Sequence, residues 1–300
     1  MPTAPLATPT IDRILCPVDF SEFSRHALEL ATNLAVRWSA ELVVLHVYVP
    51  PIVPIEVATL PLPQLEDQLL EDLEVLLQAV RARGVRAYAL LRVGAPALEI
   101  VNLAMTVRAD LVVMGTHGRT GFDRWLLGST AERVLRKAPC PVLTVCQAQH
   151  DAAADGAAPF SNVLCALDLT ARSGQTLRHA AALAAEAGGR LTVLHALEGQ
   201  WNDLSETLGH LDVPEYRRLA ESDARARLHS VVQAAVPADG DVVERVETGK
   251  AYRQILALAS GLHPDLIVVG AHGANALDTL FGSTAQHVVR GAPCPVLAVR

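Results

Sequence analysis

The amino-acid sequence predicts two tandem α/β domains, each built on a doubly wound, five-stranded parallel sheet of the flavodoxin or Rossmann-like type. The first observation is an internal repeat: ILCPVDFS (14–21) returns as VLCALDLT (163–170), and RADLVVMGTHG (108–118) returns as HPDLIVVGAHG (263–273). The second is that short runs of Val, Ile and Leu alternate with longer segments of helical period. The third is the length of 300 residues, which fits two domains of about 150 residues each.

The repeat sets the expected domain boundaries. We expect a disordered tail over 1–10, a first domain over 11–146, a linker over 147–159 and a second domain over 160–300. The linker is rich in Ala, Asp and Gly and has no hydrophobic periodicity, which is typical of a connecting segment. The correspondence between the copies shifts by six residues after their second strand, so the second copy carries an insertion there.

The elements of the first copy alternate in the order βαβαβαβαβ. Continuously apolar runs, typical of a parallel sheet covered on both faces, predict strands over 11–18, 41–49, 85–93, 110–115 and 141–145. Apolar residues at spacings of three and four predict helices over 21–38, 63–84, 95–108 and 129–137. In this architecture ligands bind at the carboxyl ends of the strands, at a topological switch point.

Composition excludes several classes of function. The formal net charge is −7, which argues against a nucleic-acid-binding surface. No apolar run reaches the roughly 18 residues of a membrane span, and the N-terminus lacks a secretory signal, so a cytoplasmic protein is expected. The five cysteines include no Cys-x-x-Cys pair, so neither a disulfide framework nor a zinc site is indicated.

The segment GTHGRTGFDRWLLGST (115–130) joins the fourth strand to the fourth helix. Its glycines, Gly115, Gly118 and Gly128, allow backbone N–H groups to approach an anion, and the helix start at Ser129 offers further donors. Arg119 and Arg124 add positive charge. These features predict a phosphate-binding loop.

A purely structural alternative exists for part of this segment. Ser129-Thr130-Ala131-Glu132 matches a capping box, as does Ser283-Thr284-Ala285-Gln286 in the second copy. Each serine can therefore be interpreted as a helix N-cap. A cap does not require a Gly-x-x-Gly at the end of a buried strand, so the complete pattern favours the anion site.

With these motifs, both halves of the chain resemble the universal stress protein family. The motif Gly-2x-Gly-9x-Gly-Ser/Thr, which marks the ATP-binding members, is complete in the first copy, and it accompanies an Asp at the end of strand one, an LHV segment and a closing PCPVL strand. The resemblance implies the strand order 3-2-1-4-5, adenine-nucleotide binding in some members and roles in stress survival. It does not imply a defined reaction.

Carried over by position, the resemblance predicts an ATP site in the first domain. The residues near adenine, ribose and phosphates would be Val18, Asp19, Val47, Met114, Gly115, Gly118, Gly128, Ser129 and Thr130. Apart from the resemblance, the charge of Arg119 in the same segment suits a contact with a phosphate. Asp19 suits a base or ribose hydroxyl, since a carboxylate repels phosphate; the alternative is that it caps the helix beginning near Ser21. Any Mg²⁺ would be held largely by the phosphates.

The second copy keeps part of this pattern. The matching residues are Asp168, Gly270, Gly273, Gly282, Ser283 and Thr284. Its interval from Gly273 to Gly282 holds eight residues where the family pattern has nine, and Arg119 is replaced by Ala274. We therefore expect nucleotide binding mainly in the first domain and weaker, different or no binding in the second.

Other polar residues have simpler interpretations. His117 and His272 could contact a phosphate or anchor their loops, and His46 and His195 are interpreted as structural. Asp110 and Asp265 precede the fourth strand of each copy at the end away from the site and are interpreted as solvated boundary residues. Cys140 and Cys294 lie between prolines, and nothing near them in sequence lowers a thiol pKa.

The sequence leaves three functions open: an ATP-binding stress regulator with little or no turnover, a slow ATPase or nucleotidyl-transfer enzyme, and a nucleotide-independent scaffold. No nucleophile–base pair is evident. The proline-led closing strands suit sheet edges, and an apolar edge is a pairing surface. In single-domain members of the family that the chain resembles, this strand typically builds the dimer, so the resemblance implies that the two halves pack as an intramolecular pseudo-dimer. A homodimer of the whole chain and an unknown protein partner are also compatible with the sequence.

Overall fold

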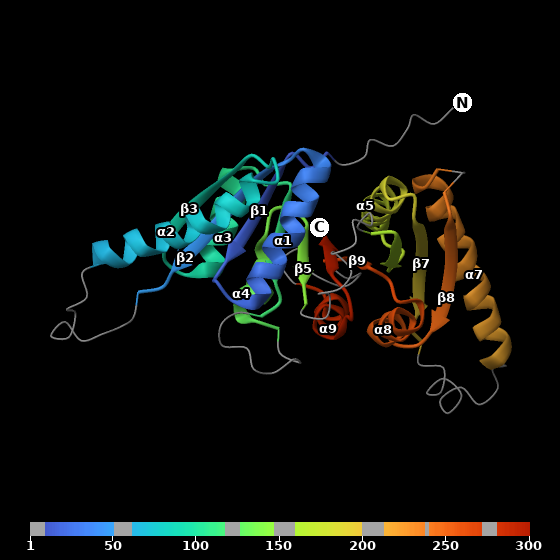
Figure 1. Cartoon of the computed structure of the whole chain (residues 1–300). Coiled ribbons are helices and arrows are strands. Elements are labelled where there is room, and N and C mark those ends of the chain that lie inside the picture. Colours follow the sequence, from blue (N-terminus) through green and yellow to red (C-terminus); the bar gives the residue numbers. More distant parts are fainter. Residues whose placement is uncertain are drawn as a thin grey trace. The chain divides into compact units, whose positions relative to one another are not determined.

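The chain was analysed as a computed structural model that describes residues 10–50, 62–117, 127–146, 160–199, 213–237, 240–271 and 281–300. It divides into two compact units, whose described residues fall within 10–146 and 160–300 (Figure 1). Each unit is described by itself.

The first unit is a parallel sheet in the order β3-β2-β1-β4-β5. Its strands are β1 (Arg13–Val18), β2 (Glu41–Tyr48), β3 (Ala87–Val93), β4 (Leu111–Gly115) and β5 (Val142–Val145). Its described helices are α1 (Glu22–Trp38), α2 (Leu62–Arg81), α3 (Pro96–Thr106) and α4 (Ser129–Lys137).

The second unit repeats this order as β8-β7-β6-β9-β10. Its strands are β6 (Asn162–Leu167), β7 (Arg190–Leu197), β8 (Val242–Thr248), β9 (Leu266–Gly270) and β10 (Val296–Val299). Its described helices are α5 (Ser173–Glu186), α7 (Val213–Ala235), α8 (Ala251–Leu262) and α9 (Ser283–Gly291). The predicted fold class and strand order are confirmed.

Right-handed crossovers place the helices in two layers. In the second unit α5 packs against α7 and α8 packs against α9, while in the first unit α3 packs against α4. Helices that follow the first two strands of a unit thus share one face of the sheet, and those that follow the third and fourth strands share the other. Both faces of the central strands are covered, which is why these strands are apolar without alternation.

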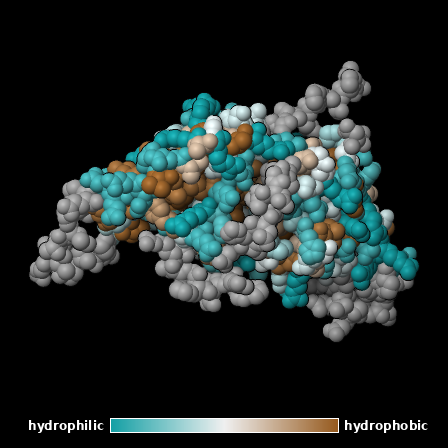
Figure 2. Space-filling view, in the orientation of Figure 1, coloured by the Kyte–Doolittle hydropathy of each residue, from teal (hydrophilic) through white to brown (hydrophobic). Residues whose placement is uncertain are grey.

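The core of the first unit lies along β1, β2 and β4. Ile14, Leu15 and Cys16 are fully buried, as are the central residues of β2. β3 is only half-buried because it ends the sheet of its unit, and Val93 at its end is 60% exposed. Figure 2 shows hydrophobic residues at the surface of this unit, and Leu70 and Val75 of α2 are exposed as well. Scattered apolar residues of this kind are normal on soluble folds.

Asp110 and Asp265 are partly exposed residues directly before the fourth strand of their unit, and they also accept hydrogen bonds that the sequence did not predict. One carboxylate oxygen of Asp110 accepts the backbone N–H groups of Asp12 and Arg13, each at 2.9 Å. Asp265 likewise accepts the N–H of Asn162 at 3.1 Å and the hydroxyl of Ser161 at 2.9 Å. An acidic residue directly before the fourth strand therefore supplies acceptors to the start of the first strand of its unit.

Among the residues that the structure describes, no helix is long and apolar enough to cross a membrane.

Candidate functional site

The turn after β1 is organised by Asp19. Its Oδ1 accepts the backbone N–H of Ser21 at 3.1 Å and the Ser21 hydroxyl at 2.5 Å. Ser21 is the N-cap of α1, and its hydroxyl oxygen accepts the N–H of Ser24. Phe20 between them has a left-handed backbone, with φ of 64°. Asp19 thus fixes the turn before the helix, while the cap itself is Ser21.

The second unit reproduces this turn. Oδ1 of Asp168 accepts the N–H of Thr170 at 3.1 Å, the Thr170 hydroxyl at 2.7 Å and the Ser173 hydroxyl at 2.9 Å. Leu169 takes the left-handed conformation of its counterpart Phe20, with φ of 55°. The strain of a non-glycine residue in this region is offset by the hydrogen bonds that Asp168 accepts.

A histidine supports the same corner in each unit. Nδ1 of His46 lies 2.7 Å from the Val18 carbonyl oxygen, and Nδ1 of His195 lies 2.9 Å from the Leu167 carbonyl oxygen. These bonds join the end of the second strand to the end of the first. They agree with the structural interpretation of both histidines.

The residue before the fourth helix is hydrogen-bonded to the residue after the fourth strand in the same way in both units. The N–H of Gly128 donates to the Thr116 carbonyl at 2.9 Å, and the N–H of Gly282 donates to the Ala271 carbonyl at 2.9 Å. Each bond holds the start of a helix beside the carboxyl end of the fourth strand of its unit.

The capping-box interpretation of Ser129 and Ser283 was wrong. The N-cap residues are Gly128 in α4 and Gly282 in α9, and no side-chain cap bond is present among the described residues. The Glu132 carboxylate pairs with Arg136 at 3.1 Å, one turn further along α4. The first N–H groups of α4 and α9 therefore face the carboxyl edge of the sheet without a capping side chain from the described part of the chain.

The first-domain residues predicted near the nucleotide converge on the ends of β1, β2 and β4 and on the start of α4. They are Val18, Asp19, Val47, Met114, Gly115, Gly128, Ser129 and Thr130. Gly118, Arg119, Gly273 and His272 lie outside the described residues. His117 is bound through Nδ1 to the Thr116 hydroxyl at 2.9 Å, which agrees with a loop-anchoring role.

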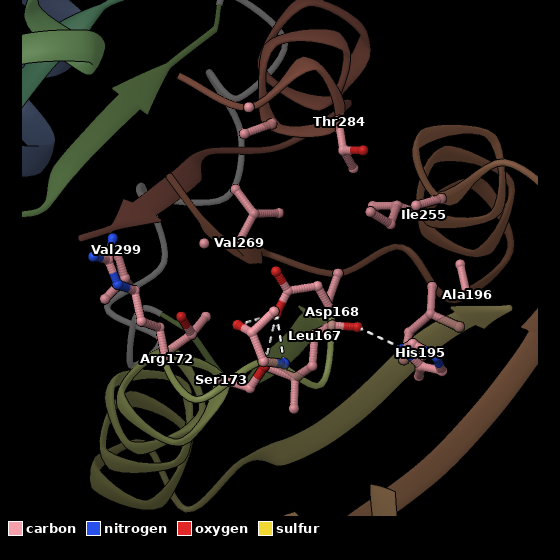
Figure 3. Close-up of a pocket in the computed structure, with 18 of the residues that line it drawn as sticks. Leu167, Asp168, Arg172, Ser173, His195, Ala196, Ile255, Val269, Thr284 and Val299 are labelled. Atoms are coloured by element: carbon pink, nitrogen blue, oxygen red, sulfur yellow. Dashed lines mark hydrogen bonds between the residues drawn. The ribbon is translucent and has the colours of Figure 1, made fainter. Parts of the chain in front are cut away.

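The second unit contains a pocket of about 510 Å³ at the carboxyl ends of its strands (Figure 3). Of the residues predicted in this copy, Asp168, Gly270, Gly282, Ser283 and Thr284 line it. Leu167, Ala196 and Val269, the counterparts of Val18, Val47 and Met114, line it too. The volume is in the range of small-molecule sites, and the walls combine apolar residues with a few converging polar groups.

The comparisons with known proteins agree with this geometry. The model of the universal stress protein family matches residues 10–145 and 159–300, which together are most of the chain. The chain belongs to the universal stress protein family.

Some relatives match about half of the chain, and a solved structure matches nearly all of it. A universal stress protein of Methanocaldococcus jannaschii, MJ0531, is 39% identical over 137 residues, which are 44% of this chain and 81% of the relative. Universal stress protein A homolog 1 of Coxiella burnetii is 33% identical over 47% of this chain and 96% of its own. A universal stress protein structure from Archaeoglobus fulgidus covers 96% of this chain and 98% of its own, with a TM-score of 0.71 and 23% identity, and supports the fold alone.

Three charged residues of the pocket in this universal stress protein were not predicted: Arg172, Glu198 and Arg300. Glu198 lies just after β7 and accepts the N–H of Ala251, the first residue of α8, at 2.6 Å. In the first domain the corresponding pair is Val49 and Pro96, and proline has no N–H to donate. Val49 and Pro96 are thus replaced together by an acceptor and a residue with a backbone N–H to donate, and this joint change is the sequence signal that could have identified Glu198.

Replacing Glu198 by valine is expected to lower the free energy of unfolding of the second domain by about 0.3–1 kcal/mol, because a carboxylate leaves the positive end of α8. A Glu198→Val/Ala251→Pro variant should recover much of the loss, since proline suits the first helical position and leaves no N–H unpaired. Urea unfolding of both variants tests this. A double variant less stable than the single one would contradict the explanation.

Cys16 and Cys165 of this universal stress protein are free, buried cysteines. Burial raises the pKa of the Cys16 and Cys165 thiols, which disfavours the reactive thiolate. Cys140 and Cys294 are buried as well. Among the described residues, no group of three or more His, Cys, Asp or Glu side chains could hold a metal ion.

Proposed function

We propose that this universal stress protein binds an adenine nucleotide, ATP in the first place, at the carboxyl ends of the strands in both domains, and that it acts as a stress regulator with little or no turnover. The observation that carries the proposal is the pocket of about 510 Å³ in the second domain, because motif residues distant in sequence meet in its wall.

Each part of the nucleotide has a chemical match in this pocket. The N–H groups at the start of α9 would donate to phosphate oxygens at the positive end of the helix. The three hydrogen bonds of Asp168 all go to Oδ1, so we assign Oδ2 to a ribose hydroxyl. The base would lie against Leu167 and Ala196, at the ends of β6 and β7.

The first domain supports the same proposal through its complete motif. Asp19 and the start of α4 occupy the positions of Asp168 and the start of α9. The sequence predicts weaker, different or no binding in the second domain, and this stays a prediction. Its pocket now favours a site there as well, so up to two nucleotides per chain are proposed.

The remaining parts of the proposal concern Mg²⁺, turnover and assembly. Any Mg²⁺ would arrive with the phosphates, which supply the oxygen ligands that it prefers. Slow hydrolysis stays the alternative activity. The cytoplasmic location, the intramolecular pseudo-dimer, a homodimer and a protein partner remain predictions.

Calorimetric titration of the full chain tests this function. We expect saturable binding of ATP, with one or two sites per chain and weaker binding of CTP. ADP release measured on the same sample should stay below one turnover per bound ATP over the titration. A chain that gives neither binding heat nor a shift in its thermal unfolding midpoint with ATP would contradict the proposal.

A further inference from the structure

The second-domain pocket contains two arginines that the first domain does not carry. Arg172 and Arg300 line the pocket. By the repeat, their counterparts in the first domain are Phe23 and Cys146. The two copies therefore differ in charge at the same two places of the fold.

The first of these places lies beside the fourth strand. In the first domain, a Cβ added to Gly115 would lie 3.0 Å from Cβ of Phe23, and the Phe23 ring lies 5.1 Å from the His117 ring. Residues at this position are thus next to the end of β4, where the phosphate-binding segment begins. In the second domain Arg172 occupies this position, directly before α5.

The second position, that of Arg300, directly follows β10, the strand that pairs with β9 on the side away from β6. Val299 of β10 pairs with Gly270 of β9, and its carbonyl accepts the N–H of Ala271 at 2.7 Å. Arg300 follows directly, so it leaves the sheet beside Ala271. In Figure 3 Arg172 and Val299 lie on one side of the pocket, while His195, Ala196 and Ile255 lie on the other.

The arginines coincide with a loss of charge elsewhere. The first-domain segment 115–130 contains Arg119 and Arg124, whereas the second-domain segment 270–284 contains no Lys or Arg. Glu198, at the end of β7 in the same pocket, adds negative charge away from β10. A phosphate is repelled by this carboxylate and attracted by guanidinium groups. The charges therefore favour a nucleotide whose phosphates lie on the arginine side of the pocket, away from Glu198.

We propose that Arg172 and Arg300 bind the phosphates of the second-domain nucleotide, in place of the arginines that this copy lacks in its loop. Guanidinium groups donate paired N–H bonds that match phosphate oxygens, and the start of α9 supplies backbone donors beside them. This inference rests on the proposed function. It makes the two sites chemically different: the second depends on arginines outside the motif.

The test uses the full chain carrying Gly128→Val, so that the second site is measured alone. Calorimetric titrations with ATP and with adenosine, which has no phosphate, are compared for Arg172→Ala/Arg300→Ala and for the control Arg178→Ala. Arg178 is an exposed arginine of α5 that does not line the pocket. We expect the double variant to bind ATP at least tenfold more weakly and adenosine unchanged, and the control to match its parent.

The outcomes separate the two claims. If Gly282→Val removes ATP binding but the double arginine variant keeps the parent affinity, the inference is overturned and the nucleotide site stands. If Gly282→Val leaves ATP binding unchanged, the pocket is not the nucleotide site and both claims fail. An equal loss of ATP and adenosine binding would assign the arginines a structural role. Should the alanine variant unfold, Arg172→Lys/Arg300→Lys keeps the charge, and unchanged ATP affinity there would contradict paired guanidinium contacts.

Discussion

A chain with valine at both Gly128 and Gly282 is expected to lose at least tenfold in ATP affinity while keeping its fold. Gly128 has φ of −58° and ψ of 138°, which any residue adopts, so its backbone conformation does not require glycine. A Cβ at Gly128 would lie 3.1 Å from the Thr116 carbonyl oxygen, the same atom that accepts the Gly128 N–H. The valine methyls would push the start of α4 away from β4 and cover its N–H donors.

Gly261→Val is the matched control for this prediction. Gly261 lies within α8, and nothing lies within 4 Å of an added Cβ. We expect unchanged ATP affinity and an equal or higher thermal unfolding midpoint, because glycine is a poor helix former. If the Gly128→Val/Gly282→Val chain bound ATP as tightly as the control, phosphate could not be held at the helix starts.

Gly189→Ala is expected to destabilise the second domain by more than about 3 kcal/mol, above the usual cost of overpacking. A Cβ at Gly189 would lie 2.2 Å from the carbonyl oxygen of Ser161 and 2.6 Å from its carbonyl carbon. The same oxygen accepts the N–H of Arg190 at 2.8 Å, at the point where β7 begins beside β6. The methyl group can be accommodated only if the two chain segments separate.

The neighbouring glycine provides the control. Gly188 has φ of 60° and open space around an added Cβ, so Gly188→Ala meets backbone strain alone, about 1–2 kcal/mol. Urea unfolding of both variants should show the larger loss for Gly189→Ala. The opposite order would mean that the close contact with Ser161 does not limit this position.

Much of the fold could be predicted from the sequence, because both copies carry the same order of apolar strand runs and segments of helical period. The apolar runs gave the strands of both sheets, and the predicted start of the fourth helix at Ser129 is confirmed. The roles of Asp110 and Asp265 could not be predicted. Their hydrogen bonds join residues about a hundred positions apart, and no local pattern reports such a contact.

The site could be predicted where it depends on the motif. Asp168, Gly270 and Gly282 meet in one pocket, as their positions at strand and helix ends imply. Arg172 and Arg300 belong to no motif, and only the placement of α5 and β10 around one cavity reveals them. Glu198 belongs to no motif either, but its pairing with Ala251 differs from Val49 and Pro96 of the first copy. The capping interpretation failed because the backbone places glycine at the N-cap of both helices.

The most direct test of nucleotide binding is a crystal structure of the full chain grown with ATP. The account predicts phosphate density within hydrogen-bond distance of the backbone N–H groups at the starts of α4 and α9, with the base at the ends of the first two strands of each domain. ATP bound away from both helix starts, or protein that stays empty at millimolar ATP, would contradict the account.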